Sequence, residues 1–458
     1  MDKDAARSGH RTNRLRRIWA GLHLTLRRTH PAKLLLLGYL LYTAFGWFLL
    51  SLPLAHEVPV SALDALFIAS SAVSTTGLVT VDPGSSFSWF GEGVIILLIQ
   101  VGGLGYMTIG SFALLAFQDR LSRVRSRTIK AEFSLPEDFS VRGFLSAVVI
   151  FTFVVQSVGA IILYLAFLAE GVENPLWSAI FHAISAFCTA GFSLNSSSFE
   201  MMQTNTTVVL TLSALSILGA VGFLIVVDAW RNLTGGARHL GFTSKVILRV
   251  TFWLLAGGTV LFYVADASIA ELSPWDRLLT AFFQVMTATT TVGFNTWPIG
   301  EISMAGLVVL MGLMVIGASP AGTGGGLKTT TLAALFGLVR STLKGRDEVR
   351  LAKRRVPAER LQSATAALAY YVALLFVALF LLGLTEAGAE FEVLMFEAIS
   401  AMGTVGLSMG ITGDLSPLGK LVVIVLMIAG RVGILTFGIA VAAHDETREE
   451  EADNNLIC

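Results

Sequence analysis

The chain has 458 residues, of which 54% are hydrophobic and 14% are charged, with a formal net charge of zero. Soluble globular domains carry about a quarter charged residues, so this composition excludes them and predicts an integral membrane protein. The two cysteines, Cys188 and Cys458, form neither a metal motif nor a disulfide framework. No short apolar stretch with a cleavage site follows the basic N-terminal residues, so we expect no signal peptide.

Long apolar stretches follow one another in pairs along the chain. Each is long enough, or nearly so, to span a bilayer as a helix. They cover residues 33–53, 91–117, 142–169, 206–228, 245–265, 302–318, 363–384 and 417–443. Between the members of each pair lies a shorter apolar segment of about 10–13 residues, which is typical of a re-entrant half-helix. The sequence therefore predicts an all-α polytopic membrane protein.

One pattern occurs four times, once in each shorter segment. The copies are Phe67–Leu78, Phe181–Phe192, Phe283–Phe294 and Phe396–Leu407. Ten residues before the shared glycine of each copy stands Phe, six before stands Ser or Thr, and two before stands Thr. Four copies in a hydrophobic chain predict four repeats of span, pore half-helix, filter loop and span (M1-P-M2), with pseudo-fourfold symmetry around a central ion pore.

The shared glycines are suited to an ion filter. Conducting a bare cation requires fixed oxygens that replace its hydration shell, and glycine lets the backbone turn its carbonyls inward. The threonine two residues earlier adds a hydroxyl or supports the loop. Because each half-helix ends just before its loop, the negative end of its dipole favours a cation in the pore.

The repeats divide the chain into six parts. They are a basic N-terminal segment (1–32), repeat 1 (33–118), repeat 2 (142–230), repeat 3 (245–340), repeat 4 (363–443) and an acidic tail (444–458). Of the 32 lysines and arginines, 29 lie in the N-terminal residues up to Lys33, in the linking regions 118–142, 230–249 and 328–360, or in the tail. The positive-inside rule then predicts a multi-pass protein of the cell (plasma or inner) membrane with both termini cytoplasmic.

The second span of each repeat carries two small or bending residues three positions apart. The pairs are Gly102 and Gly105, Gly219 and Gly222, Gly317 and Pro320, and Gly430 and Gly433. Close helix packing through small residues is one explanation. A bend where these helices line the pore is the other, and the two are compatible.

Residues 317–331 interrupt the second span of repeat 3. Pro320 and the glycines of this segment cannot form a regular helix. It is either a kinked helix end with a poorly ordered link or a flexible intramembrane loop beneath the filter. A phosphate-binding loop is excluded, because Leu327 rather than glycine precedes Lys328 and no strand leads into the segment.

Arg431 lies in the middle of the last apolar stretch, 25 residues after Gly406. Burying it costs at least about 2.5–3.5 kcal/mol, so it is not expected to face lipid. It either pairs with another group or with helix carbonyls, or it lies in the pore below the filter, where its charge raises the barrier to cations. The equivalent positions Gly103, Ala220 and Ala318 are small.

These motifs resemble the Trk/Ktr/HKT superfamily of potassium transporters over about residues 33–443. About 30 residues precede the first repeat, so the KtrB branch, rather than the longer TrkH, is expected to be nearer. The resemblance implies a potassium-binding filter of four carbonyl-lined segments. Its residues are Ser74, Thr75, Thr76 and Gly77; Cys188, Thr189, Ala190 and Gly191; Thr290, Thr291, Val292 and Gly293; and Gly403, Thr404, Val405 and Gly406.

The same resemblance implies a gate and its control. The gate residues are Gly317, Pro320, Gly322, Gly324, Gly325, Gly326, Lys328 and the pore arginine Arg431. The implied assembly is a homodimer bound to a cytosolic, nucleotide-binding ring of the KtrA/TrkA type. Glycine at position 77 argues against the sodium preference that serine gives in related plant transporters. The residues depart from the TVGYG motif of potassium channels at Thr76 and Ala190, which predicts looser selectivity.

The expected function is potassium uptake by symport or channel-like flow, with no cofactor bound by this chain, potassium ions in the filter and sodium as a second candidate ion. One alternative is the ion-conducting subunit of an ATP-driven potassium pump, and another is a sodium- and potassium-permeable member of the superfamily. A membrane-embedded enzyme is not expected, because Arg431 is the only clear mid-span ionisable residue. His182 and Gln284, on the half-helices, are expected to be packed or hydrogen-bonded there, and Cys188 to be a small apolar residue.

Overall fold

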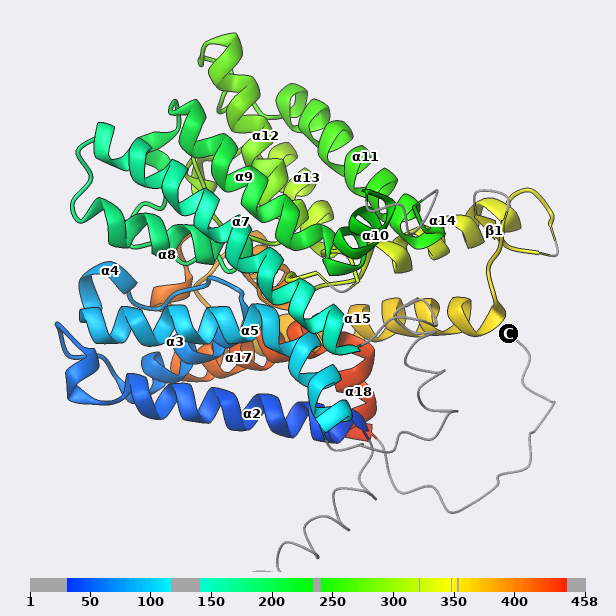
Figure 1. Ribbon diagram of the computed structural model, residues 1–458, viewed down its shortest axis with the longest axis horizontal. Coiled ribbons are helices and arrows are strands. Elements are labelled where there is room, and N and C mark those ends of the chain that lie inside the picture. Colours follow the sequence, from blue (N-terminus) through cyan, green and yellow to red (C-terminus); the bar gives the residue numbers. More distant parts are fainter. Residues whose placement is uncertain are drawn as a thin grey trace, which may run out of the picture.

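The structure is a computed structural model that describes residues 31–116, 141–233, 240–320, 322–346, 348–351 and 354–442. The predicted N-terminal segment and acidic tail fall almost wholly outside these residues. The described chain is a bundle of helices in four consecutive groups (Figure 1). Each group contains a long helix, a buried short helix and a second helix that leads away, which is the predicted repeat.

The first two groups follow the repeat order. Repeat 1 consists of α2 (Pro31–Leu50), η1 (Pro53–Ala55), α3 (Ala62–Ser74), α4 (Pro83–Ser86) and α5 (Trp89–Ala116). Repeat 2 consists of α7 (Val141–Ala169), α8 (Pro175–Phe187), η2 (Glu200–Met202), α9 (Thr206–Val221) and α10 (Phe223–Leu233). The short helices α3 and α8 are the predicted half-helices, and we call these and their counterparts in repeats 3 and 4 the pore helices.

The last two groups repeat this order. Repeat 3 consists of α11 (Phe242–Ala265), α12 (Pro274–Thr290), η3 (Ile299–Glu301), α13 (Met304–Val315) and α14 (Thr329–Thr342). Repeat 4 consists of α15 (Ala358–Thr385), α16 (Phe391–Gly403), η4 (Thr412–Asp414), α17 (Pro417–Val432) and α18 (Ile434–Ala442). The pore helices here are α12 and α16.

A two-stranded antiparallel hairpin joins repeats 3 and 4. Its strands are β1 (Arg350–Leu351) and β2 (Arg354–Arg355), and Arg350 pairs with Arg355. The Arg350 guanidinium donates to the exposed Glu348 carboxylate at 3.0 Å. This hydrogen bond and the nearby charge of Arg355 hold the pKa of Glu348 below its usual value.

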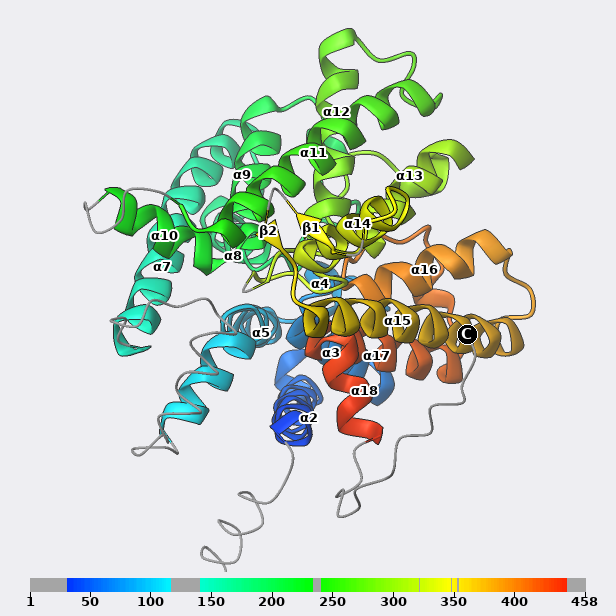
Figure 2. The same cartoon turned by 90° about the vertical axis from the view of Figure 1, so that its right-hand side faces the viewer.

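The four groups close into a ring (Figure 2). Its seams are four packed helix pairs, namely α5 with α8, α9 with α12, α13 with α16, and α17 with α3. The phenylalanine that begins each sequence copy is fully buried at these seams, which gives it a packing role in every repeat. These residues are Phe67, Phe181, Phe283 and Phe396. The last pair brings repeat 4 against repeat 1, so the pseudo-fourfold arrangement is confirmed.

Large apolar side chains cover the outside of the bundle. Phe48, Phe252 and Phe376 are 62%, 61% and 72% exposed. An exposed apolar surface on long helices is stable only against lipid, which supports a membrane location. Three described helices are long and apolar enough to cross a membrane, and five if each bent helix pair counts as one span.

Two predicted spans are not continuous helices. The stretch 206–228 bends by 90° between α9 and α10, and the stretch 417–443 bends by 107° between α17 and α18. The residues at the breaks are Gly222 and Gly433, with φ angles of 92° and 96° that an L-residue rarely adopts. The stretch 302–318 is also shorter than predicted, because α13 ends at Val315, before the Gly317 segment.

In three of the small-residue pairs the first glycine allows close packing and does not bend the helix. A Cβ on Gly102, Gly219 or Gly430 would collide with the carbonyl oxygen of Val73, Phe187 or Met402, each near the end of a pore helix. Close packing and bending are therefore both present, at different members of a pair. The repeat 3 pair differs, because Gly317 packs against the Gly325 carbonyl.

Candidate ion pore

The four loops that follow the pore helices share one unusual backbone conformation. The threonine two residues before each shared glycine lies in the left-handed region, with φ of 50° at Thr75, 50° at Thr189, 59° at Thr291 and 51° at Thr404. This region is strained for a β-branched residue. The same strain at four equivalent positions indicates a functional geometry and not an isolated irregularity.

Equivalent hydrogen bonds hold these loops. The residue before each glycine donates its N–H to the carbonyl six positions before that glycine, as from Thr76 to Ser71 at 2.9 Å and from Val405 to Ser400 at 2.8 Å. The hydroxyls of Ser71 and Ser400 also accept from the N–H groups of Gly77 and Gly406, each at 3.1 Å. These bonds explain the serine of the pattern in repeats 1 and 4, for which sequence reasoning assigned no role, whereas in repeat 2 the Ser185 hydroxyl donates to the Phe192 carbonyl at 2.8 Å.

The four glycines form a closed ring. A Cβ built on Gly77 would lie 3.2 Å from the Cα of Gly191, and the same relation holds at 3.0 Å from Gly191 to Gly293. It continues at 3.1 Å from Gly293 to Gly406, and at 3.1 Å from Gly406 back to Gly77. Each such Cβ would also press on the carbonyl oxygen that precedes the next glycine. A side chain at any of these positions would therefore obstruct the ring.

The side chains predicted for the filter point into protein. All those of the threonines and of Ser74, Cys188, Ala190, Val292 and Val405 are buried. Ser74 and Thr76 hydroxyls, for example, lie 2.6 Å apart and bond to each other. The carbonyl oxygen that precedes each glycine lies against the next glycine, so backbone oxygens border the ring.

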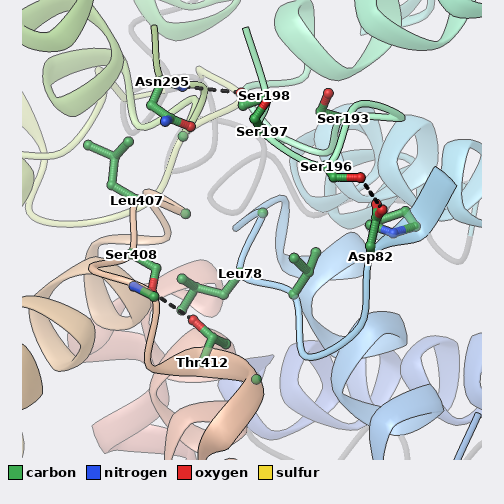
Figure 3. A pocket seen from close by; sticks show the side chains of 18 of the residues that line it. Leu78, Asp82, Ser193, Ser196, Ser197, Ser198, Asn295, Leu407, Ser408 and Thr412 are labelled. Atoms are coloured by element: carbon green, nitrogen blue, oxygen red, sulfur yellow. Dashed lines mark hydrogen bonds between the residues drawn. The ribbon is translucent and has the colours of Figure 1, made fainter. Parts of the chain in front are cut away.

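A cavity of about 320 Å³ opens on one side of the ring (Figure 3). The four glycines form its base, and its walls are the segments that leave the loops, including Asp82, Ser198 and Thr412. Ser196 donates to Asp82 at 2.6 Å, joining the walls of repeats 1 and 2. The polar side chains of the lining are hydroxyls, two amides (Asn195 and Asn295) and two carboxylates (Asp82 and Glu200), which suits a hydrated cation.

The segment 317–331 lies on the opposite side of the ring. Thr75 donates its hydroxyl to the Thr323 carbonyl at 3.3 Å, and Thr189 donates to the Thr323 hydroxyl at 3.1 Å. Thr323 in turn donates to the Phe187 carbonyl at 3.2 Å. Thr323 is therefore joined to the loops of repeats 1 and 2 directly beneath the ring.

The next two residues of this segment reach the other two loops. A Cβ on Gly324 would press on the Thr291 hydroxyl, and one on Gly325 would lie 2.8 Å from the Thr404 methyl group. Glycine is needed at both positions because only hydrogen fits there. Residues 323–325 thus contact all four left-handed threonines, and the segment covers the ring from below.

The helix break between α9 and α10 in repeat 2 stabilises the segment 317–331 beneath the ring. Because α9 stops at Val221, the last carbonyls of the helix have no partner further along it. Thr323 donates its N–H to the Gly219 carbonyl at 3.1 Å, and Ser319 to Ala220 at 3.2 Å. Within the segment, Ala318 donates to Gly325 at 3.1 Å, and Lys328 donates to Gly324 at 2.8 Å. The described residues of the segment before α14 form a hydrogen-bonded loop and not a kinked helix end.

Arg431 lies beside this loop and not in lipid. It is 4% exposed. It donates to the Thr323 carbonyl, and to the Gly102 carbonyl at 2.5 Å. Its side chain therefore joins repeat 4 to the loop of repeat 3 and to α5 of repeat 1. The carbonyl partners and the position below the ring, which the sequence left as alternatives, occur together.

Sequence reasoning missed Thr323 among the residues of this loop. It stands between glycines in a segment read for its glycines and its proline, and its partners lie more than 100 residues away in sequence. The predicted residues Gly317, Gly322 and Gly326 do lie in the loop. Gly322 packs on the Ala220 carbonyl, and Gly326 has a φ of 70°. Pro320 is half-buried beside them.

The fold and the ring define a class: an all-α polytopic membrane protein with four span–pore helix–span repeats around a central ion pore. A family model described as "TrkH: Cation transport protein" matches residues 46–450. The chain therefore belongs to this family of cation transport proteins. It is a transport protein and not an enzyme.

The chain is similar to curated members over most of its length. It is 37% identical to the Ktr system potassium uptake protein B of Vibrio alginolyticus, covering 90% of each chain. It is 36% identical to the potassium/sodium uptake protein NtpJ of Enterococcus hirae, covering 91% of this chain and 94% of the relative. The crystal structure of the potassium transporter TrkH from Vibrio parahaemolyticus matches with a TM-score of 0.68 at 20% identity, over 88% and 84% of the two chains, which shows a shared fold.

Proposed function

We propose that this protein takes up potassium ions across the cell membrane through the glycine ring. The observation that carries the proposal is the identical backbone geometry of the four loops, with a left-handed threonine and a glycine at each corner. Backbone oxygens at four equivalent corners are suited to a dehydrated monovalent cation. Glycine at all four corners and the names of the potassium uptake relatives support potassium.

The loop 317–331 and Arg431 are proposed as the gate. In this arrangement the loop covers the inner side of the ring, and the arginine adds a positive charge there, so the pore is closed. The loop leads directly into α14 and the hairpin, which lie at the same end of the molecule as the start of α2 and the end of α18 (Figure 1). A cytosolic nucleotide-binding ring at this end, with both termini cytoplasmic and two chains in a homodimer, completes the proposed assembly.

Sodium is the second candidate ion. The relative NtpJ is named a potassium/sodium uptake protein and shares 36% identity with this chain. Ion choice in such a ring depends on the spacing of oxygens and on the stiffness of the loops, both of which can differ between relatives.

Flux measurements on purified protein in proteoliposomes test the proposal. Wild type should pass K⁺ in preference to Na⁺. Gly77→Ser should lower both the K⁺ flux and the preference, because its Cβ would press on the Ala190 carbonyl. Arg431→Ala should raise flux by removing a charge and a loop contact. Gly312→Ala is the control, because a Cβ there meets no atom within 4 Å. If neither wild type nor Arg431→Ala passes a cation, the pore assignment is wrong. It is also wrong if wild type is active and Gly77→Ser leaves its flux and preference unchanged.

A further inference from the structure

The residue directly after the buried phenylalanine of each pore helix faces the segment that leaves the filter loop. We call it the anchor position. The four anchor residues are Ile68, His182, Gln284 and Glu397. Eleven residues after each stands the second residue beyond the shared glycine, which we call the exit position. The exit residues are Val79, Ser193, Asn295 and Ser408.

Glu397 hydrogen-bonds two residues of the segment that leaves the repeat 4 loop. It is fully buried, and no ion pair involves it among the described residues. Its two carboxyl oxygens accept from the Ser408 hydroxyl at 2.8 Å and from the Thr412 hydroxyl at 2.5 Å. Ser408 and Thr412 both line the cavity above the ring (Figure 3). The carboxyl group thus fixes the exit segment of repeat 4 from behind.

His182 makes the corresponding contact in repeat 2. Its Nε2 atom accepts from the Leu194 N–H at 3.2 Å and lies 3.1 Å from the Ser193 hydroxyl. The acceptor role of Nε2 places the proton on Nδ1, which lies 2.7 Å from the Ser178 carbonyl. Ser193 accepts from the N–H two residues on at 3.0 Å, as Ser408 accepts from Gly410 at 3.0 Å. The two corners are therefore built alike.

Repeat 3 uses an amide for the same purpose. Gln284 donates to the Trp297 carbonyl at 3.0 Å, and Asn295 donates to the same carbonyl at 3.2 Å. In repeat 1, by contrast, both positions are apolar, since Ile68 and Val79 belong to one hydrophobic cluster. In repeats 2, 3 and 4 the anchor residue thus hydrogen-bonds the segment that leaves the loop, whereas the anchor residue of repeat 1 contributes apolar packing.

We propose that Glu397 is a positioning residue for ion selectivity, acting through Ser408 and Thr412 on the carbonyls of the repeat 4 loop. The inference rests on the proposed function of the ring. Discrimination between K⁺ and Na⁺ requires that the oxygens keep their separation instead of closing on the smaller ion. A carboxyl group buried behind the loop resists that movement, because shifting the loop would break two hydrogen bonds to a fully buried group.

The variant Glu397→Gln tests this with almost no change of volume. An amide has one acceptor oxygen, so one of the two hydroxyls loses its acceptor. The K⁺ to Na⁺ flux ratio in proteoliposomes should fall about threefold to tenfold, the equivalent of one ordinary hydrogen bond. The matched control is Glu390→Gln, which makes the same change at the exposed start of the same pore helix and should keep the wild-type ratio.

A double-variant cycle separates positioning from a general loss of structure. If Glu397 acts through Ser408, then Ser408→Ala should lower the ratio by itself, and adding it to Glu397→Gln should lower the ratio little further. Unfolding would instead reduce all flux, and the thermal midpoint in detergent would reveal it. Should Glu397→Gln fail to assemble, Ser408→Ala and Thr412→Val carry the same test.

Each outcome has a distinct meaning. If wild type prefers K⁺ and both Glu397→Gln and Ser408→Ala stay within about twofold of its ratio, the inference about Glu397 is overturned while the proposed function stands. If wild type itself shows no preference for K⁺, the proposed function fails and the inference fails with it.

Discussion

At the scale of single residues, the ring combines a strained residue with an unstrained one. Each left-handed threonine costs about 1–3 kcal/mol, and this cost is tolerated only because surrounding bonds fix the loop. Each shared glycine adopts a positive φ without such a cost. Threonine therefore sets the direction in which the loop leaves the pore helix, and glycine allows four loops to meet within van der Waals distance of one another.

We expect Gly191→Ala to block the pore. The φ of 67° is unfavourable for alanine, and the new Cβ would press on the Val292 carbonyl and lie 3.0 Å from the Gly293 Cα. Proteoliposome flux should fall at least about tenfold, the effect of roughly 1.4 kcal/mol. Gly312→Ala, in the middle of α13 with open space around it, should retain wild-type flux. Equal flux in both variants would contradict the ring geometry.

At the scale of elements, one helix break supports a loop in another repeat. The end of α9 presents the carbonyls of Gly219 and Ala220, and the backbone of the loop 317–331 donates to both. Unpaired carbonyls in a membrane interior are costly, so the loop and the helix end stabilise each other. If the loop moves, it must leave these carbonyls to water in the pore, which sets a threshold for opening.

Thr323→Val should lower that threshold. The substitution keeps the shape of the side chain but removes the hydroxyl that joins the loop to Thr189 and to the Phe187 carbonyl. Loss of two hydrogen bonds of about 0.5–1.5 kcal/mol each should raise flux about fivefold or more without the regulatory partner. Thr211→Val on α9 is the control, because its hydroxyl bonds only within its own helix, to the Thr207 carbonyl. A Thr323→Val flux no higher than that of the control would exclude this contact from the gate.

Some elements were predictable from sequence and others were not. The four half-helices followed from repeated local patterns, and the structure confirms them. For the paired small residues that include Gly222 and Gly433, the sequence left two explanations, a bend or close packing. It could not decide between them, because a glycine in a helix can serve either purpose. Sequence reasoning missed the contacts of Thr323 and those of the anchor residue Glu397, since both depend on which segments meet in space.

At the scale of the whole molecule, the ring closes where repeat 4 meets repeat 1. Lys420, near the start of α17, pairs with Asp64 of α3 at 2.8 Å, and the two side chains are 14% and 15% exposed. The other two described ion pairs are exposed and both lie near the hairpin. The pair at the seam is therefore the ion pair that joins repeat 4 to repeat 1 among the described residues.

Lys420→Met should lower thermal stability. Removing one partner of a largely buried pair leaves the Asp64 charge poorly compensated, which costs about 1–3 kcal/mol. The Tm in detergent should fall by a few degrees, and adding Asp64→Asn should restore part of the loss. Arg350→Met removes an exposed pair of similar length and should leave the Tm unchanged. Equal shifts in the two variants would show that the seam gains nothing from its ion pair.

The ring of one chain has a consequence for how its selectivity changes over time. In an assembly of four identical subunits, a single codon alters every corner at once, so a cost of about 1 kcal/mol per corner becomes about four times as large. Here one codon alters one corner. Repeat 1 has the apolar residues Ile68 and Val79 at the positions that are polar in the other three repeats, and only such an arrangement can hold this difference. A single substitution therefore changes the ion preference of this protein through one of the four corners at a time.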